Sequence, residues 1–117
     1  METIKQEHER LTREDVIIQA QFGEEDTEQV VIDPTDFHLR FFVRGRTAEV
    51  LCSRDGSEPP QNCRIEEDGT VTCFLPKNTF PPGPLWLEDM DTTPEHGFED
   101  GTFETIGRMP TGIEYIV

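Results

Sequence analysis

An alternating apolar pattern runs through FHLRFFVRGRTAEVLCS, residues 37–53, and it constrains the fold more than any other feature of the sequence. If Gly45-Arg46 forms a two-residue loop with Gly leading, as in a type II′ turn, the flanking segments pair as an antiparallel hairpin. This register sets three apolar pairs against one another: Leu39–Cys52, Phe41–Val50 and Val43–Ala48. A slip of one residue would mix the two faces. The pattern therefore predicts a hairpin with one buried face.

A second hairpin is predicted in NCRIEEDGTVTCFL, residues 62–75. A two-residue loop at Asp68-Gly69 would place Ile65 against Thr72 and mix the faces. A three-residue loop over 67–69, with the Gly in the left-handed conformation, instead pairs Ile65 with Val71 and Cys63 with Cys73. We favour the three-residue loop because it keeps the apolar side chains together.

Other short segments have strand patterns separated by turn formers. They are residues 15–22, 29–32, 85–90, 103–109 and 112–117, the last two divided by Pro110. Residues 54–62 and 92–101 are expected to be loops, and Pro81–Pro84 an extended edge segment with Phe80 tucked beneath it. Seven or eight short strands with frequent turns are typical of an antiparallel β-sandwich or a small barrel. We expect a single domain over 15–117, preceded by a charged lead-in, 1–14, that is frayed or forms one helical turn around Ile4, His8 and Leu11.

The chain has 117 residues and a net charge of −15, from 25 acidic and 10 basic side chains. The charge is uneven: residues 1–35 carry 10 acidic and 3 basic groups, residues 36–88 carry 8 and 6, and residues 89–117 carry 7 and 1. Such a field disfavours nucleic acids and anionic membranes as partners. No apolar run approaches a membrane span, and the N-terminus lacks the apolar core of a secretory signal. We expect a soluble protein that stays where it is made.

The sequence offers no convincing catalytic group. Ser53 and Ser57 lie outside any nucleophile-elbow motif. Cys52 and His38 are predicted on opposite faces of the first hairpin, so that the imidazole cannot act as a base for the thiol. Three cysteines are an odd number, and we expect thiols, although the opposition of Cys63 and Cys73 makes a cross-strand disulfide conceivable. We therefore expect a protein that is not an enzyme and has no cofactor.

Metal-binding patterns are absent or weak in the sequence. The cysteines and histidines form no zinc knuckle. Acidic residues do gather near the C-terminal third: Asp89, Asp91, Glu95, Glu99 and Asp100. Their spacing does not fit an EF-hand loop, and a solvated acidic loop is the simpler interpretation. A carbohydrate- or calcium-assisted binding domain, using residues 89–100 and Trp86, remains the alternative function.

Apolar residues on the polar face of the first hairpin suggest a protein-binding surface. Phe42 and Leu51 are predicted to point outward, and Trp86 is expected on the same side. A contiguous exposed apolar patch indicates a partner. The competing interpretation is that the N-terminal strand or the proline-rich loop covers these side chains. The candidate partner-binding residues are Phe42, Leu51, Trp86, Arg40 and Arg44, with Glu49 also at the rim.

Several segments resemble the N-terminal immunoglobulin-like domain of phage baseplate upper proteins and short virion proteins of Bacteroides-type phages and prophages. The matching segments are DFHLRFFV, AEVLCS, NCRIEEDGTVTCFLP, NTFPPGPL, LWLE and the C-terminal MPTGIEYIV. They cover about half of the chain, and the similarity is one of pattern.

The resemblance implies an immunoglobulin-like sandwich that assembles through its sheet faces and is multimeric in the virion, without cofactor or catalysis. Longer members carry a further C-terminal region that has no counterpart here, so that a minimal module is expected. Together these observations predict an all-β, immunoglobulin-like antiparallel β-sandwich. Its expected function is that of a tail or baseplate component binding other protein subunits, with a homo-oligomer as one form.

Overall fold

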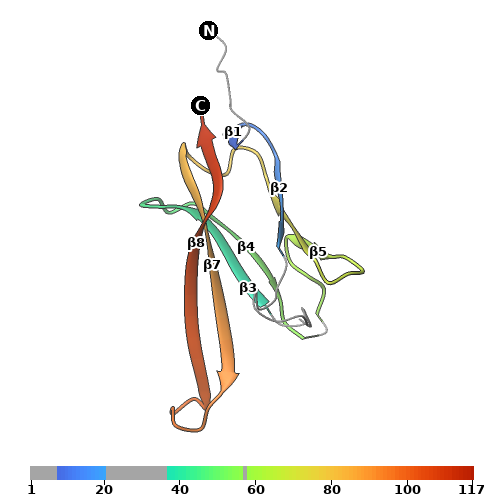
Figure 1. Ribbon diagram of the computed structural model, residues 1–117, viewed down its shortest axis with the longest axis vertical. Helices are drawn as coiled ribbons and strands as arrows, with labels where there is room; N and C mark the ends of the chain where they lie inside the picture. The colour runs from blue at the N-terminus through green and yellow to red at the C-terminus, as the bar shows by residue number, and fades with distance from the viewer. Residues whose placement is uncertain (1–7, 21–36, 57) are drawn as a thin grey trace.

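The computed structural model describes residues 8–20, 37–56 and 58–117, and this part of the chain folds into eight strands (Figure 1). They form a five-stranded sheet, in the order β1-β8-β7-β3-β4, and a three-stranded sheet, in the order β2-β6-β5. Neighbouring strands are antiparallel, except for the parallel pair of β1 and β8. The strands are β1 (Glu9–Leu11), β2 (Val16–Ala20), β3 (Phe37–Val43), β4 (Glu49–Arg54), β5 (Cys63–Ile65), β6 (Val71–Leu75), β7 (Gly83–Pro94) and β8 (Thr102–Ile116). No helix within these ranges is long and apolar enough to cross a membrane.

The core lies between the two sheets, in a sandwich-like arrangement that confirms the all-β prediction. Alternate side chains of β3 and β4 point inward, as the sequence pattern requires. Cys52 is fully buried, whereas His38 lies on the opposite face of its sheet and contacts Asp55. The buried apolar cluster consists of Val16, Phe37, Leu39, Phe41, Val43, Val50, Cys52, Val71, Cys73, Leu75, Phe80, Leu85 and Tyr115.

The first hairpin has the predicted register, but its loop is longer than predicted. Leu39 pairs with Cys52 and Phe41 with Val50, while the ladder ends before the expected pair of Val43 and Ala48. The chain turns earlier, because the N–H of Arg46 donates to the carbonyl of Val43 at 3.0 Å. Gly45 has φ 79° at the third position of this turn, a conformation that favours glycine. The two-residue loop was therefore wrong, although the facing of the strands was right.

The second hairpin confirms the three-residue loop. Cys63 pairs with Cys73 and Ile65 with Val71. The N–H of Glu66 donates to the carbonyl of Thr70 at 2.8 Å, which closes the loop over residues 67–69. Gly69 has φ 88°, the left-handed conformation that this loop needs.

The C-terminal third forms one long hairpin instead of several short strands. The expected break at Pro110 is absent, since Pro110 pairs with Trp86 inside β8. The backbone is irregular just after Pro110. There the register of the β7–β8 ladder shifts between Pro84 and Trp86, and Gly112 has φ 87°. Thr111 stabilises this bulge: its hydroxyl donates to the carbonyl of Leu85 at 2.9 Å and accepts the N–H of Ile113 at 3.2 Å. The bulge is local, so β8 continues as one strand past Pro110.

Two further expectations about this region had different outcomes. Gly83 and Pro84 begin β7 and pair with β8, whereas β3 joins β7 only from Leu85 onward, so this start of the strand is paired on one side, as expected of an edge. The polar loop begins at residue 95 and not at 92, because β7 continues to Pro94. The anchoring role expected for Phe80 is confirmed: its ring is buried and stacks on Tyr115 at a centroid distance of 5.3 Å.

The N-terminal expectations have mixed outcomes. Val16–Ala20 form β2 within the predicted strand. Part of the expected lead-in, Glu9–Leu11, forms β1 beside β8 instead of a helical turn. Ile4 and the strand expected over residues 29–32 lie outside the described residues.

The hairpin of β7 and β8 projects beyond the rest of the molecule (Figure 1). β3 pairs with β7 only from Leu85 to Asp89. Further along, β7 pairs with β8 as far as Pro94 and Thr102. We call residues 90–106 the arm. It contributes to an elongated shape of 58 × 32 × 30 Å.

Candidate interaction face

All five predicted contact residues lie on one side of the five-stranded sheet. This outer face is the side turned away from the three-stranded sheet, and two cross-strand rows define it. The rows are Glu49–Phe42–Trp86–Pro110 and Leu51–Arg40–Glu88–Arg108. Arg44 joins them through its guanidinium, which lies 5.3 Å from the centroid of the Trp86 ring. The structure therefore brings together residues that the sequence could only assign to a common side.

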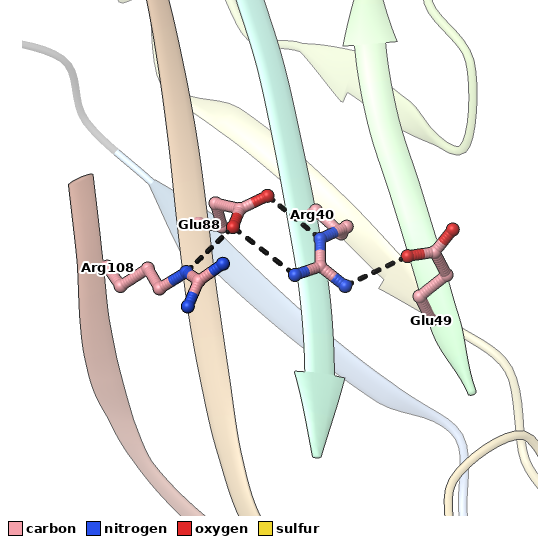
Figure 2. Close-up of polar contacts among 4 residues, drawn as sticks. All are labelled: Arg40, Glu49, Glu88 and Arg108. Atoms are coloured by element: carbon pink, nitrogen blue, oxygen red, sulfur yellow. Dashed lines mark hydrogen bonds and ion pairs between the residues drawn. The ribbon is translucent and has the colours of Figure 1, made fainter. Parts of the chain in front are cut away.

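Arginine and glutamate side chains form a continuous network across four strands of this face (Figure 2). Arg40 donates to both carboxylate oxygens of Glu88, from Nε to Oε2 at 2.8 Å and from Nη2 to Oε1 at 3.2 Å. Its Nη1 reaches Glu49 at 3.0 Å, and Nε of Arg108 donates to Glu88 Oε1 at 2.8 Å. Such paired, charge-assisted bonds fix side-chain geometry as well as supplying energy.

The network changes the acid–base behaviour of Glu88. Its carboxylate accepts hydrogen bonds from Arg40 first and Arg108 second, and these lower its pKa to about 2. The Glu88 side chain is only 15% exposed, which limits solvent screening of the contacts. In return, the hydrogen bond to Glu88 raises the pKa of Arg40. Both groups are therefore charged throughout the neutral range.

Phe42 is buried, contrary to the expected outward exposure. Only 8% of the residue is accessible. The guanidinium carbon of Arg40 lies 4.2 Å from its ring centroid, and that of Arg108 lies at 5.7 Å. These distances are those of cation–π contacts. Within the described chain, the arginine network covers this ring.

Leu51 is the exposed apolar member of the predicted set, at 47% accessibility. It lines a hollow of about 230 Å³ on the outer face. The lining residues are His38, Leu39, Arg40, Leu51, Ser53, Glu88 and Met90. Next to this hollow, Met90 pairs with Ile106, which is 59% exposed.

Glu88, Met90, Ile106 and Arg108 are functional candidates that sequence reasoning missed. They lie on the predicted strands 85–90 and 103–109, but the sequence did not assign these strands to one another. The structure places Glu88 and Met90 opposite Arg108 and Ile106, and cross-strand pairs of this kind become visible only once the register is known.

Comparison of the sequence with protein-family models, with curated proteins and with solved structures finds no match.

The acidic segment does not assemble a metal site in the described residues. No group of three histidine, cysteine, aspartate or glutamate side chains there could hold a metal ion. Two of its carboxylates cap turns at the tip of the arm: Glu95 accepts the N–H of Gly97 at 3.2 Å, and Asp100 accepts that of Thr102 at 3.1 Å. The hydrogen bonds from Thr102 lower the pKa of Asp100. Glu95 and Asp100 thus have a local structural role.

The three cysteines are free thiols gathered on one side of the core. Cys52 donates to the carbonyl of Asn62 at 3.4 Å, and Cys63 donates to that of Ser53 at 3.9 Å. Burial raises the pKa of Cys63 to about 11, and hydrogen bonding to Cys52 followed by burial raises that of Cys73. A raised pKa disfavours the thiolate that nucleophilic chemistry requires at Cys63 and Cys73, whereas the hydrogen bond with Cys73 lowers the pKa of the buried Cys52.

A larger and more open hollow, of about 990 Å³, lies beside the β5–β6 loop. Its lining is polar, and two of its charged groups are paired: Arg64 contacts Glu66 at 2.7 Å, and Glu66 also accepts the hydroxyl of Thr72 at 2.9 Å. A partner surface usually combines apolar contact with a polar rim. The hollow beside Leu51 fits that description better.

Proposed function

We propose that this protein is a non-enzymatic assembly module that binds another protein subunit through the outer face of its five-stranded sheet. The observation that carries the proposal is the exposed Leu51 at an apolar hollow, set within the ordered network of Arg40 and Glu88. Preformed charged groups around an apolar centre favour a specific partner and orientation.

The buried members of the face have a supporting role in this proposal. Phe42 and Arg40 form a rigid layer beneath the contact surface, which we call the floor. The Phe42 ring is covered, and the Arg40 guanidinium is bonded at three of its nitrogens. Leu51, half-buried Trp86 and Arg44 supply the contact surface. A rigid floor lowers the entropy lost when a partner binds.

A finer assignment rests on the sequence resemblance. We propose an immunoglobulin-like module of a phage or prophage tail or baseplate, supported by the segments quoted above and by a two-sheet architecture. Genes for portal, tape-measure or tail-fibre proteins beside the coding gene are the expected context. Polysaccharide-utilisation genes would favour the carbohydrate-binding alternative instead.

Light scattering after size exclusion, over a concentration series, tests the role of the outer face. We expect concentration-dependent association that Leu51→Asp abolishes, because a charge in the hollow would have to be desolvated. Ile17→Asp is the matched control, since Ile17 is exposed on β2 in the other sheet. Equal loss of association in both variants would argue against a specific face. A chain that stays monomeric over the whole concentration series would also argue against this face as a site of self-association.

A further inference from the structure

The tip of the arm presents an aromatic pair to solvent. Phe98 and Phe103 stack at a centroid distance of 5.9 Å, yet 51% and 46% of these residues remain accessible. The tip is well formed: the N–H of Glu95 donates to the carbonyl of Gly101 at 2.8 Å, and that of Gly101 donates to the carbonyl of Phe98 at 2.9 Å. An ordered, exposed aromatic pair on a projecting hairpin is suited to docking.

The charges of the arm and of the outer face are complementary. Residues 90–106 contain five acidic side chains and no lysine or arginine: Asp91, Glu95, Glu99, Asp100 and Glu104. The outer face instead carries three arginines against two glutamates: Arg40, Arg44 and Arg108 against Glu49 and Glu88. The arm is thus negative, while the outer face has one more arginine than glutamate, and this difference of sign favours contact between them.

The arm cannot fill the hollow of its own molecule. Met90 lines the hollow and is also the first residue of the arm. The arm therefore starts at the hollow and extends away from it. Strands rise about 3.3 Å per residue, which places the tip residues several residue-lengths beyond the hollow. The arm can therefore reach such a hollow only in a second molecule.

From this arrangement we infer that the aromatic tip of one copy docks into the Leu51 hollow of a second copy. The inference rests on the proposed function, and it names the partner as another copy of this chain. The acidic residues of the tip lie next to Arg108 and Arg44 of the receiving copy. Tip and hollow are different surfaces, so a single contact joins two copies head-to-tail and leaves one tip and one hollow available to further contacts.

A head-to-tail contact has a signature that a face-to-face dimer lacks. Leu51→Asp blocks the hollow and leaves the tip intact, while Phe98→Ser/Phe103→Ser blocks the tip and leaves the hollow intact. Each variant alone is expected to be monomeric, with affinity lowered about tenfold or more because central aromatic anchors carry most of the binding energy. An equimolar mixture is expected to form one-to-one dimers and nothing larger. The unmodified chain grows beyond the dimer or closes into a ring.

Sedimentation velocity near 0.15 M salt measures these outcomes, since the Debye length there is about 8 Å and long-range repulsion is screened. Glu99→Lys/Glu104→Lys is a second test of the arm that keeps both aromatic rings, and it is expected to weaken association as well. Unchanged melting temperatures show that each variant is folded.

Some results would overturn the inference. A monomeric unmodified chain, or a tip variant that associates like the unmodified chain, excludes docking of the arm. If Leu51→Asp alone prevents association and the tip variants do not, the outer face still binds a subunit and only the arm inference fails. A mixture that stays monomeric rules out the head-to-tail contact.

Discussion

The guanidinium carbon of Arg40 lies 4.2 Å from the ring centroid of Phe42, two residues further along the same strand. Both side chains point to the outer face, and Arg40 is held in place by Glu88 on β7 and Glu49 on β4. The arginine therefore covers an aromatic ring and links three strands at once. Five predictions test this and other features of the structure.

Phe42 and Leu51 should differ sharply in their effect on stability. Phe42→Ala is expected to lower the free energy of unfolding by about 3 kcal/mol, because the ring is buried beneath two arginines. Leu51→Ala is expected to lower it by about 1 kcal/mol or less, since half of the side chain is already in water. Urea unfolding of the two variants provides the measurement. Similar losses would mean that Phe42 is not part of the folded floor.

Glu88 should make the stability sensitive to acid. Its pKa is about 2 in the folded protein, against 4.5 as the ordinary value, so its contribution is complete above about pH 4.5 and is lost as the pH falls toward 2. We expect Glu88→Gln to remove about 1–2 kcal/mol at pH 7 and to flatten this part of the pH profile.

Glu67→Gln is the matched control for that experiment, because Glu67 is an exposed carboxylate in the β5–β6 loop. Thermal unfolding between pH 2 and 7 compares the three proteins. The assignment is wrong if the Glu88 variant keeps the acid-induced loss seen in the unmodified chain.

Gly83 should not tolerate a side chain. A β-carbon at this position would lie 2.7 Å from Cγ1 of Val43, and the backbone φ is 144°, a value that side chains disfavour. Gly83→Ala is expected to destabilise the fold by about 1–3 kcal/mol. At Gly107, also in a strand, a β-carbon would meet nothing within 4 Å, so Gly107→Ala should be neutral or slightly stabilising. Equal melting temperatures for the two variants would contradict the close approach of β3 and β7.

The hydroxyl of Tyr115 should contribute little to stability at neutral pH. It is buried and has no hydrogen-bond partner in the described chain, although its ring stacks on Phe80. Tyr115→Phe is expected to leave the unfolding free energy unchanged or to raise it by about 1 kcal/mol.

Alkaline pH gives this variant a second readout. Burial raises the pKa of Tyr115 to about 12, against an ordinary value of 10. The unfolded chain therefore ionises first, and the protein loses stability between about pH 10 and 12. Tyr115→Phe should remove that loss. A marked destabilisation at pH 7 would show instead that the hydroxyl has a bonding partner.

Cys63 and Cys73 should be the pair that oxidation links. Backbone bonds join Asn62 to Phe74 and Glu66 to Thr70, so the alternation of the ladder places the two cysteines at a non-hydrogen-bonded pair. At such pairs the side chains lie closest, within the range that a disulfide requires.

Glutathione disulfide provides the test, since it accepts two electrons and leaves as two thiols while the protein dithiol loses two protons. We expect the reaction to be slow at neutral pH and faster at alkaline pH, because the pKa of Cys63 is raised to about 11. Peptide mapping should find the 63–73 link in the unmodified chain and in Cys52→Ser, and none in Cys63→Ser. A link between Cys52 and Cys73 would refute the assignment.

Local alternation made much of the central fold predictable. The facing of Leu39 with Cys52 and of Cys63 with Cys73 follows from side-chain parity, which survives an error in loop length. The shape of the first loop was missed because a turn centred one residue earlier leaves the same side chains of β3 and β4 facing inward. Pro110 was misinterpreted because its missing N–H forbids some ladder positions and not others.

The candidate site was only partly predictable. Sequence placed Phe42, Arg40 and Trp86 on one side, but could not tell that Arg40 and Arg108 cover the ring. The missing partners, Glu88 and Arg108, come from β7 and β8, whose register depends on a bulge at Thr111 that no short pattern specifies.

The amino-acid sequence by itself determined an all-β chain, the inward side of its central strands and the acidic character of its C-terminal third, because these depend on residues near one another in the chain. Tertiary structure alone decided which strands became neighbours, and with them the burial of Phe42, the low pKa of Glu88 and the projection of the arm. The physical reason is that a side chain's charge and exposure depend on groups that folding brings to it from distant parts of the sequence.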